Sequence, residues 1–276
     1  MIIIKDEISS RANETVKMLA SLQTKKGRES SRLFMVEGVK LTDEVIRCAL
    51  PVEYIILSKS RSGELMDKYT EMLSVGEFAN AKLLVVSDGV FEKISTEKAP
   101  QGVISIVKYL DIFDNLDIIY KEEIFLSPNE KAMLLCSVRD PSNLGAIIRS
   151  AAAFGVDRLI LSSDCADVYN PKTLRSAMGS LFKIKISFVS DLASFILGCR
   201  EVGRRVFSAE LNPGAMRADS GELTDKDLIV IGNEGHGVSR EVSEACDRAV
   251  YIPICDGAES LNAAVAASVL MWIQFK

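Results

Sequence analysis

Residues 132–161 read AMLLCSVRDPSNLGAIIRSAAAFGVDRLIL and decide the fold of the second half of the chain. The apolar run Ala132–Ser137 predicts a strand, Leu144–Phe154 has helical length and Arg158–Leu161 predicts a second strand. Between the first strand and the helix, Asp140 to Asn143 supply residues typical of turns and helix N-caps. A strand, a helix and a strand in this order favour a parallel sheet with crossover helices.

The same alternation continues to the end of the chain. The strand runs are continuously apolar, as in strands that are covered on both faces. An α/β fold with a parallel sheet is therefore predicted, with ligands bound beyond the carboxyl ends of its strands. The further strands expected are Ile184–Phe188, Arg205–Ser208, Leu228–Ile231 and Val250–Pro253, and the further helices are Lys172–Leu181, Leu192–Val202, Ser239–Ala245 and Leu261–Gln274.

The first half has shorter alternating elements, which predict a small α/β unit of ~100 residues that can bury its own core. Helices are expected at Ala12–Leu22, Gly38–Ala49 and Glu64–Val75, and strands at Leu33–Val36, Val52–Leu57, Lys82–Val86 and Val103–Val107. The domains predicted are residues 1–110 and 131–276, joined by an acidic linker over residues 111–130. Within that linker, Ile118–Leu126 is open to a second interpretation as an added edge element.

Composition excludes several classes of protein. The chain has 276 residues, 48% hydrophobic and 26% charged, which excludes a disordered chain. Its single histidine excludes a multi-histidine metal centre, while a Ser-His-Asp hydrolase stays possible. The apolar start, Ile2–Ile4, is too short for a secretory signal, and no stretch reaches the ~18–20 apolar residues of a membrane span. We therefore expect a cytoplasmic protein without membrane or metal partners.

Charge is unevenly distributed. Residues 1–110 carry 16 Lys/Arg against 15 Asp/Glu, whereas residues 111–276 carry 17 against 23, so the net charge of −5 comes from the second half. The densest basic segment is KKGRESSR, residues 25–32. It is interpreted either as a solvated loop or as a loop that contacts phosphate groups. The candidate RNA-binding residues in it are Lys25, Lys26, Arg28 and Arg32.

The cysteines suggest no reactive site. No two of the six have the C-x-x-C spacing of zinc or dithiol sites. We expect reduced thiols packed as small apolar side chains, as in cytosolic proteins.

Three loops that follow predicted strands have unusual compositions. The first is RDPSNLGAIIRS, residues 139–150, where Asn143 is interpreted as a helix cap and Arg149 stands in the second helical turn. The second is GNEGHGVS, residues 232–239, whose three glycines indicate a close backbone approach without forming a dinucleotide fingerprint.

In that second loop Glu234 is a candidate positioned polar group. His236 is interpreted as a loop or capping residue rather than a general base, and Ser239 as the cap of the next helix. The third loop is IPICDGAESLNAA, residues 252–264, in which Ser260 and Asn262 both stand where a helix cap is needed.

Together these loops resemble the three signature motifs of the SpoU (TrmH-type) RNA ribose methyltransferases of the SPOUT superfamily. The match covers about residues 131–276. Its first motif runs from Asp140 through Asn143 and Gly145 to Arg149, its second from Gly232 through Glu234 and Gly237 to Ser239, and its third from Ile252-Pro253 to Ser260-Leu261-Asn262. Upstream, FMVEG at residues 34–38 looks like the start of the L30e-like substrate-binding domain found in many members. Cys255 and Ala264 depart from the Met and Ser common in the third motif.

The resemblance implies transfer of a methyl group from S-adenosylmethionine to a ribose 2′-hydroxyl of ribosomal or transfer RNA, with 23S rRNA favoured. It also implies a homodimer and a C-terminal deep trefoil knot, an exception to the un-knotted rule. The reaction-site residues carried over are Asn143, Arg149, Glu234, Ser260 and Asn262. The cofactor-binding residues carried over are Gly232, Asn233, Ile252 and Leu261.

The role of Arg149 is open between two interpretations. Family proposals make this arginine the base that removes the 2′-hydroxyl proton, in some cases across the dimer. A guanidinium has a pKa above ~12, so we favour a role in holding the neighbouring phosphate and stabilising the developing alkoxide.

Two other functions are alternatives to the methyltransferase. One is a catalytically inactive RNA- or ribosome-binding protein of the same fold, against which the complete set of site residues argues. The other is a nicotinamide-dependent oxidoreductase, which lacks its G-x-G-x-x-G turn here.

Overall fold

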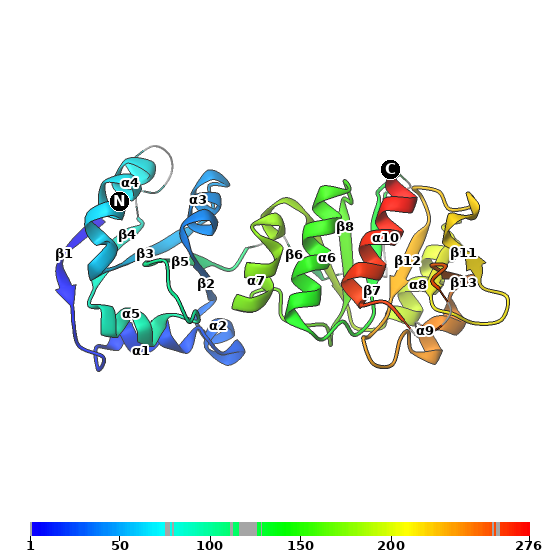
Figure 1. The fold of residues 1–276 in the computed structure, drawn as a ribbon, viewed down its shortest axis with the longest axis horizontal. Coiled ribbons are helices and arrows are strands. Elements are labelled where there is room, and N and C mark those ends of the chain that lie inside the picture. The colour runs from blue at the N-terminus through cyan, green and yellow to red at the C-terminus, as the bar shows by residue number, and fades with distance from the viewer. Residues whose placement is uncertain are drawn as a thin grey trace. The chain divides into compact units, whose positions relative to one another are not determined.

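A computed structural model describes residues 2–74, 78, 80–110, 113–115, 126–127, 129–255, 257 and 260–276. These residues form two compact units. Residues up to Leu110, together with Tyr169–Phe182, make the first unit, and the second contains the rest (Figure 1). No sequence pattern predicted that a segment beyond residue 168 would group with the first unit. Tyr169 explains it, because its hydroxyl accepts a 2.8 Å hydrogen bond from the backbone N–H of Leu110 and its ring stacks on Tyr109.

The first unit contains a mixed five-stranded sheet in the order β1-β4-β3-β5-β2. Strands β1, β4 and β3 are parallel, and β5 runs antiparallel to both of its neighbours. The strands are β1 (Ile2–Ile8), β2 (Leu33–Glu37), β3 (Val52–Ser58), β4 (Lys82–Val86) and β5 (Val103–Lys108).

Helices lie on the two faces of this sheet (Figure 1). Helices α1 (Glu14–Ser21) and α5 (Asp88–Ile94) pack together over one core cluster, which includes Leu19, Phe91 and Ile106. Helices α3 (Val39–Arg47) and α4 (Lys59–Ser74) contact the sheet through β5, β2, β3 and β4. The unit is completed by α2 (Lys25–Ser31) and by α7 (Pro171–Ala177) with the 3-10 turn η2 (Ser180–Lys183) after it.

The second unit is built on an eight-stranded sheet in the order β11-β13-β10-β12-β7-β8-β9-β6, and every pairing in it is parallel. The parallel sheet predicted from the sequence is therefore confirmed. Its strands are β6 (Phe113–Asn115), β7 (Ala132–Leu135), β8 (Arg158–Ser162), β9 (Lys185–Val189), β10 (Val206–Ala209), β11 (Met216–Arg217), β12 (Leu228–Ile231) and β13 (Arg248–Tyr251). The trefoil knot expected from the resemblance stays a prediction.

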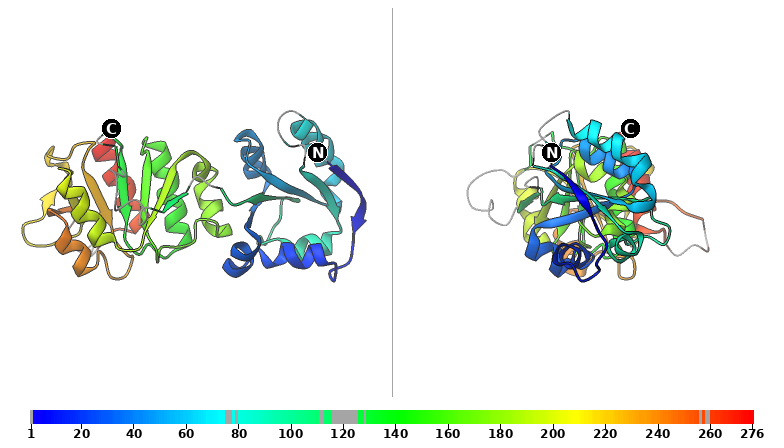
Figure 2. Two further views of the ribbon diagram at one scale, coloured as in Figure 1. Left: turned by 180° about the vertical axis from the view of Figure 1, so that it is seen from behind. Right: turned by 90° about the vertical axis from the view of Figure 1, so that its left-hand side faces the viewer.

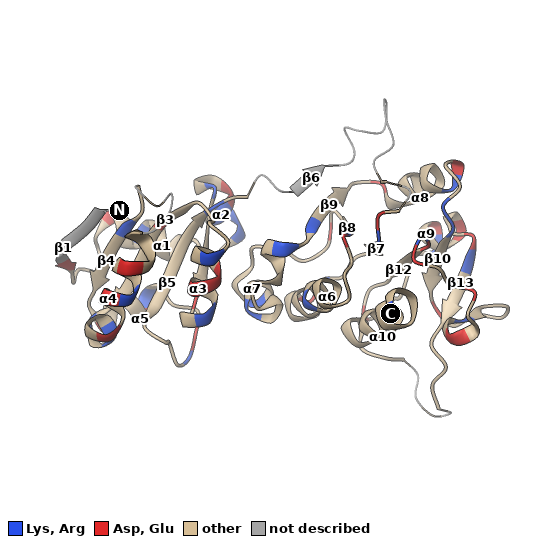
Figure 3. Cartoon of the chain, turned by 90° about the horizontal axis from the view of Figure 1, so that it is seen from above, with Lys and Arg blue, Asp and Glu red and all other residues tan. Residues whose placement is uncertain are grey.

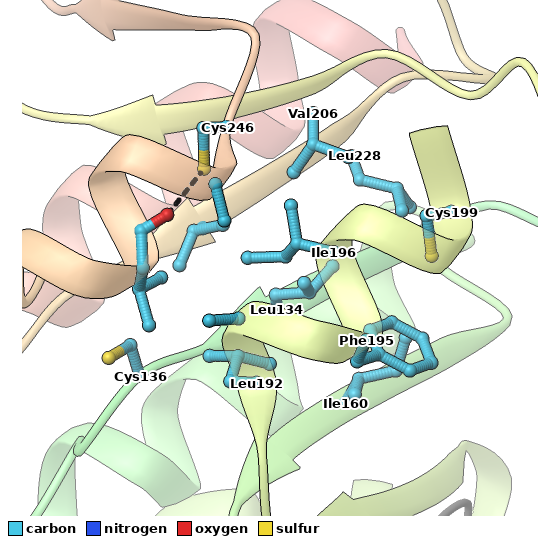
Figure 4. Close-up of a cluster of buried hydrophobic side chains, with 14 of the residues drawn as sticks. Leu134, Cys136, Ile160, Leu192, Phe195, Ile196, Cys199, Val206, Leu228 and Cys246 are labelled. Carbon is cyan, nitrogen blue, oxygen red and sulfur yellow. Dashed lines mark hydrogen bonds between the residues drawn. The ribbon is translucent and has the colours of Figure 1, made fainter. Parts of the chain in front are cut away.

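Helices cover both faces of the parallel sheet, which explains why its strands are continuously apolar. Helices α6 (Pro141–Ala153) and α10 (Ala263–Phe275) pack on one face, and α8 (Leu192–Glu201) and α9 (Arg240–Ala245) on the other (Figures 2 and 3). The short turn η3 (Ala218–Ser220) contacts α10. Under α8 and α9 lies a core that includes Phe195, Ile196 and Leu228 (Figure 4). Burying each such side chain stabilises the fold by roughly 1.5–3 kcal/mol.

Several elements differ from those expected. Strand β1 and helix α5 lie where the sequence predicted no element, and β6 lies inside the predicted linker. The possible edge element Ile118–Leu126 lies almost wholly outside the described residues. The segment 25–32, predicted as a loop, is mostly helix α2, which Thr24 caps by accepting a hydrogen bond from the N–H of Gly27. None of the helices in the described ranges is long and apolar enough to cross a membrane.

Candidate active site at the carboxyl edge of the parallel sheet

The strand order of the second sheet reverses between β7 and β12. From β7 the chain adds β8 and β9 on one side, and then returns to place β10, β12 and β13 on the other. Ligands bind at such a reversal, just beyond the carboxyl ends of the strands. The loops after β7 and β12 meet there, where the Asn233 side-chain amide donates a 2.8 Å hydrogen bond to the Ser137 carbonyl.

Three of the expected reaction-site residues form a chain of hydrogen bonds. The Asn143 amide donates to Glu234 Oε1 at 2.8 Å, and the Asn262 amide donates to Asn143 Oδ1 at 3.0 Å. Asn143 thus acts as donor to the second loop and as acceptor from the third. The structure brings one side chain from each of the three signature loops into direct contact.

The cap of α6 is not the residue that the sequence suggested, whereas the caps of α9 and α10 are among those expected. Asp140 caps α6, because its carboxylate accepts from the N–H groups of Ser142 and Asn143. The Asn143 side chain is therefore available for Glu234. Asn262 caps α10 through its Oδ1, which accepts from Ala264 and Val265, while its NH2 group reaches Asn143. Capping of α9 by Ser239 is confirmed.

Ser137 links this chain to a second network that sequence reasoning missed. Its φ of 56° lies in the left-handed region, which is costly for a residue other than glycine. Its N–H donates to Ser162 Oγ at 2.8 Å and its hydroxyl to Asp164 Oδ2 at 2.7 Å. With its carbonyl held by Asn233, each polar group of Ser137 has a partner.

Asp164 anchors that network. Partial burial would raise the pKa of Asp164, but hydrogen bonds from Arg139, Ser162 and Ser137 outweigh it and lower the pKa to about 2. Arg139 Nη2 lies 2.7 Å from Asp164 Oδ2. The loop that carries Asp140 and Asn143 is thereby tied to the loop after β8.

Arg149 projects from α6 and is exposed. Within the described part of the chain it has no hydrogen bond or ion pair, so its guanidinium is available to a ligand or a partner. The next residue, Ser150, lies 2.7 Å from Ser268 of α10, hydroxyl to hydroxyl. Arg149 is therefore not part of the Asn143–Glu234–Asn262 chain.

A pocket of about 390 Å³ opens beyond the carboxyl ends of β10 and β13. Of the expected cofactor-binding residues, Ile252 and Leu261 line it, and Ser260 lines it as well. Most of its lining is apolar, including Leu211, Val250, Ile254 and Leu270. Since Ser260 and Leu261 directly precede Asn262, the pocket and the hydrogen-bonded chain share one segment.

Gly232 and Asn233 are not among the residues that line this pocket. A Cβ at Gly232 would lie 2.2 Å from the carbonyl carbon of Gly237 and 2.3 Å from the nitrogen of Val238, so only glycine fits there. Asn233 organises its own loop, because its Oδ1 accepts from the N–H groups of Gly235 and His236. The close backbone approach expected from the glycines occurs within the loop, between Gly232 and the backbone of Gly237 and Val238.

Glu210 is a second polar residue that sequence reasoning missed. It follows β10 directly and lines the pocket. The signal available in the sequence was an acidic residue two positions after a predicted strand, which is where binding residues lie in such sheets.

The basic segment divides into two kinds of residue. Lys25, Lys26 and Arg32 are exposed, and Arg32 lies 4.6 Å from the centre of the Tyr109 ring. Arg28, by contrast, is only 1% exposed, and its guanidinium donates to the carbonyls of Leu22 and Gln23. Assigning Arg28 to RNA binding was therefore wrong, because a phosphate cannot reach it in this fold.

The cysteines have different environments. Cys136, Cys199 and Cys246 are buried, and burial raises the pKa of Cys199 and of Cys246 to about 12 (Figure 4). Cys255 departs from the expectation, because it is exposed. Among the residues that the structure describes, no group of three His, Cys, Asp or Glu residues is placed to hold a metal ion.

Comparison with known proteins assigns the two halves. The SpoU rRNA Methylase family model matches residues 131–272, and the MRM3-like substrate binding domain matches residues 13–105. The chain is 30% identical to the 23S rRNA (guanosine(2553)-2′-O)-methyltransferase RlmP of Bacillus subtilis, covering 96% of this chain and 98% of that protein. It is 29% identical to the 23S rRNA (uridine(2479)-2′-O)-methyltransferase of Streptomyces viridochromogenes, over 96% and 90%.

A solved structure agrees over the full length. The AdoMet-bound rRNA methyltransferase from Sinorhizobium meliloti superposes with a TM-score of 0.81 at 27% identity, covering 98% of this chain and 97% of that one. The family model spans more than half of the chain and includes all three loops that meet at the sheet edge. The chain therefore belongs to the SpoU rRNA methylase family.

Proposed function

We propose that this protein transfers a methyl group from S-adenosylmethionine to a ribose 2′-hydroxyl of ribosomal RNA, with 23S rRNA as the favoured substrate. The observation that carries the proposal is the contact of Asn143 with Glu234 and Asn262 beside a pocket of cofactor size. The relatives named above, two of them 23S rRNA 2′-O-methyltransferases, support it. We further propose that the protein acts in the cytoplasm.

The pocket fits the cofactor in both size and chemistry. Its apolar lining, with Ile252 and Leu261, suits an adenine ring, and its polar residues include Ser260 and Glu210. When bound, S-adenosylmethionine supplies an electrophilic methyl group. The residues of the chain then have to align the ribose oxygen with that group and exclude competing geometries, and such alignment contributes on the order of 7–11 kcal/mol at best.

Four of the five reaction-site residues have a proposed task. Asn143 and Asn262 hold the reaction edge in one geometry, because each uses both ends of its amide. Arg149 binds the phosphate beside the target ribose and stabilises the negative charge that develops on the 2′-oxygen. We place the hydroxyl of Ser260 near the reacting groups, because it lines the pocket and Asn262 has replaced it as the helix cap.

We propose a homodimer that forms through α10. Val265 and Trp272 are exposed by 49% and 54% and lie seven residues apart on this helix. Such spacing puts them on one helical face, and large apolar side chains gathered on a face are typical of protein interfaces. Arg149, on the adjacent α6, then lies close enough to the interface to serve the partner's site.

Mixing two inactive variants tests whether Arg149 acts across the dimer. In a heterodimer of Arg149→Ala and Asn143→Ala protomers, an arginine that acts in trans leaves one complete site, so activity returns to roughly half of the wild-type value per dimer. An arginine that acts in cis leaves both sites incomplete, and the mixture stays inactive.

We propose that residues 1–110 select the RNA and residues 131–276 carry the chemistry. The exposed Lys25, Lys26 and Arg32 are the candidate phosphate contacts. Each lost contact should lower the salt dependence of RNA binding by close to one unit in a plot of log K against log salt. The matched control is Lys17→Ala on α1, whose amine is paired with Glu14.

The decisive experiment combines two measurements. Calorimetry asks whether the protein binds S-adenosylmethionine, and mapping of 2′-O-methyl groups in rRNA asks whether one site depends on the protein and is restored by it in vitro. RNA binding without cofactor binding would favour the catalytically inactive alternative. Loss of methylation in Arg149→Ala with cofactor affinity retained would support the role given to Arg149, whereas equal loss of both would contradict it.

A further inference from the structure

Glu210 lines the pocket but lies outside the three signature motifs. It lies one residue beyond the carboxyl end of β10, between the strands β12 and β13, and lines the pocket with Leu211 and Ile252. Its backbone N–H donates a 3.0 Å hydrogen bond to the carbonyl of Val250, which ties it to the neighbouring strand.

One carboxylate oxygen of Glu210 is already held in place. Oε1 accepts a 2.5 Å hydrogen bond from the Ser208 hydroxyl and another from the hydroxyl of Ser243 on α9. Ser208 is only 1% exposed, so its hydroxyl is shielded from water. Oε2 has no hydrogen-bond donor among the described residues. Two serines therefore fix the orientation of a carboxylate and leave its second oxygen available to a ligand.

A ligand that fills the pocket and displaces water has to bring a donor to this oxygen. A carboxylate accepts hydrogen bonds and cannot give one, so its partner must be a hydroxyl, an amine or an N–H group. The lining around it is otherwise mostly apolar, which suits a flat base and leaves few other acceptors for the hydroxyls of an attached sugar. In dinucleotide-binding sheets, an acidic residue placed near the end of a strand binds ribose hydroxyls for the same reason.

We infer that Glu210 accepts hydrogen bonds from the ribose hydroxyls of the adenosine part of the cofactor. Ser208 and Ser243 act as positioning residues for this carboxylate. The inference rests on the proposed function, because it assumes that the pocket takes S-adenosylmethionine, and it adds the residue that recognises the sugar.

The test pairs a protein change with a ligand change. Binding of S-adenosylhomocysteine and of its 2′,3′-dideoxyribose analogue is measured by calorimetry for the wild type and for Glu210→Gln. The glutamine keeps an oxygen for the two serines and presents an NH2 group in place of the free acceptor. We expect the wild type to bind the dideoxy analogue at least 10-fold more weakly, and Glu210→Gln to bind S-adenosylhomocysteine about 10-fold more weakly with less than 3-fold discrimination against the analogue.

The control is Glu241→Gln, the same substitution at an exposed position of α9, which should bind both ligands as the wild type does. Circular dichroism and melting temperature establish that both variants are folded. If the wild type binds neither ligand, the proposed function fails. If it binds S-adenosylhomocysteine and Glu210→Gln discriminates between the ligands as strongly as the wild type, the pocket stands and the role of Glu210 is overturned.

Discussion

Replacing Asn143 by aspartate tests the hydrogen-bonded chain with almost no change of shape. The substitution exchanges the NH2 group, which lies 2.8 Å from Glu234 Oε1, for an oxygen. A charge-assisted hydrogen bond of roughly 1.5–3 kcal/mol is lost. Two carboxylates about 3 Å apart also repel each other by on the order of 2 kcal/mol. This value lies between the repulsion expected in bulk water and that expected near a protein surface, because Glu234 is exposed.

The two effects together disfavour the assembled site by about 4 kcal/mol, or close to a thousandfold in its population. Because the side chains can turn apart, we expect methyl transfer to rRNA to fall by 100- to 1000-fold at pH 8 while S-adenosylhomocysteine still binds. Part of the loss should return as the pH is lowered, because like charges so close retain one proton between them. The assay is incorporation of a labelled methyl group across this pH range.

Two further variants isolate the cause. Ser142→Asp adds the same charge one residue away, in the first turn of α6, where acidic residues are tolerated, and should be nearly as active as the wild type. Combining Asn143→Asp with Glu234→Gln restores a donor opposite an acceptor and should recover at least 10-fold. A wild-type rate for Asn143→Asp, or no recovery in the combined variant, would refute this reasoning.

Three other predictions concern stability and are measured by chemical unfolding. Gly232→Ala should destabilise the protein by about 1–3 kcal/mol, because its methyl group meets backbone atoms that cannot turn away; an unchanged midpoint would contradict this. Glu130→Gln should cost about 3 kcal/mol, because Glu130, 9% exposed, is the ion-pair partner of the buried Arg158; a loss below 1 kcal/mol would show the pair to be dispensable. Asp164→Asn should lower the free energy of unfolding by about 1 kcal/mol at pH 7. The loss is small because the ion pair of Asp164 with Arg139 is partly exposed to solvent. In the folded protein the pKa of Asp164 is lowered from 3.8 to about 2. Its contribution to the free energy of unfolding is therefore present above pH 4 and is lost as the pH falls towards 2. The wild type and Asp164→Asn should be equally stable below pH 2.

The elements that the sequence predicted well are those whose signal is local. The central strands β7, β8 and β12 of the second sheet are largely apolar runs, and α6 begins where Asp140 and Pro141 indicate a start. Strand β1 has a short apolar sequence, but it becomes a strand only by pairing with β4, some 80 residues away. Helix α2 has no apolar period, and it is held by the Thr24 cap and by the burial of Arg28 against backbone carbonyls.

The candidate site shows the same division. Asn143, Glu234 and Asn262 were identified because each stands in a motif, and the structure shows that they are in contact. Which of them caps a helix was not predictable, because Asp140 and Asn143 are both good caps and only the presence of Glu234 decides between them. Glu210 and Asp164 lie outside the motifs, and each has a partner distant in sequence, Ser243 for Glu210 and Ser137 for Asp164.

The cap of α10 has a consequence for biosynthesis. Asn262 begins the last helix of the described chain and supplies one end of the hydrogen-bonded chain at the reaction edge. The loops after β7 and β12 are translated long before it, yet they lack their third member until residues 263–275 have emerged and packed against α6. A nascent chain therefore lacks a complete site until α10 has left the ribosome and packed, so its earlier loops cannot act on ribosomal RNA alone.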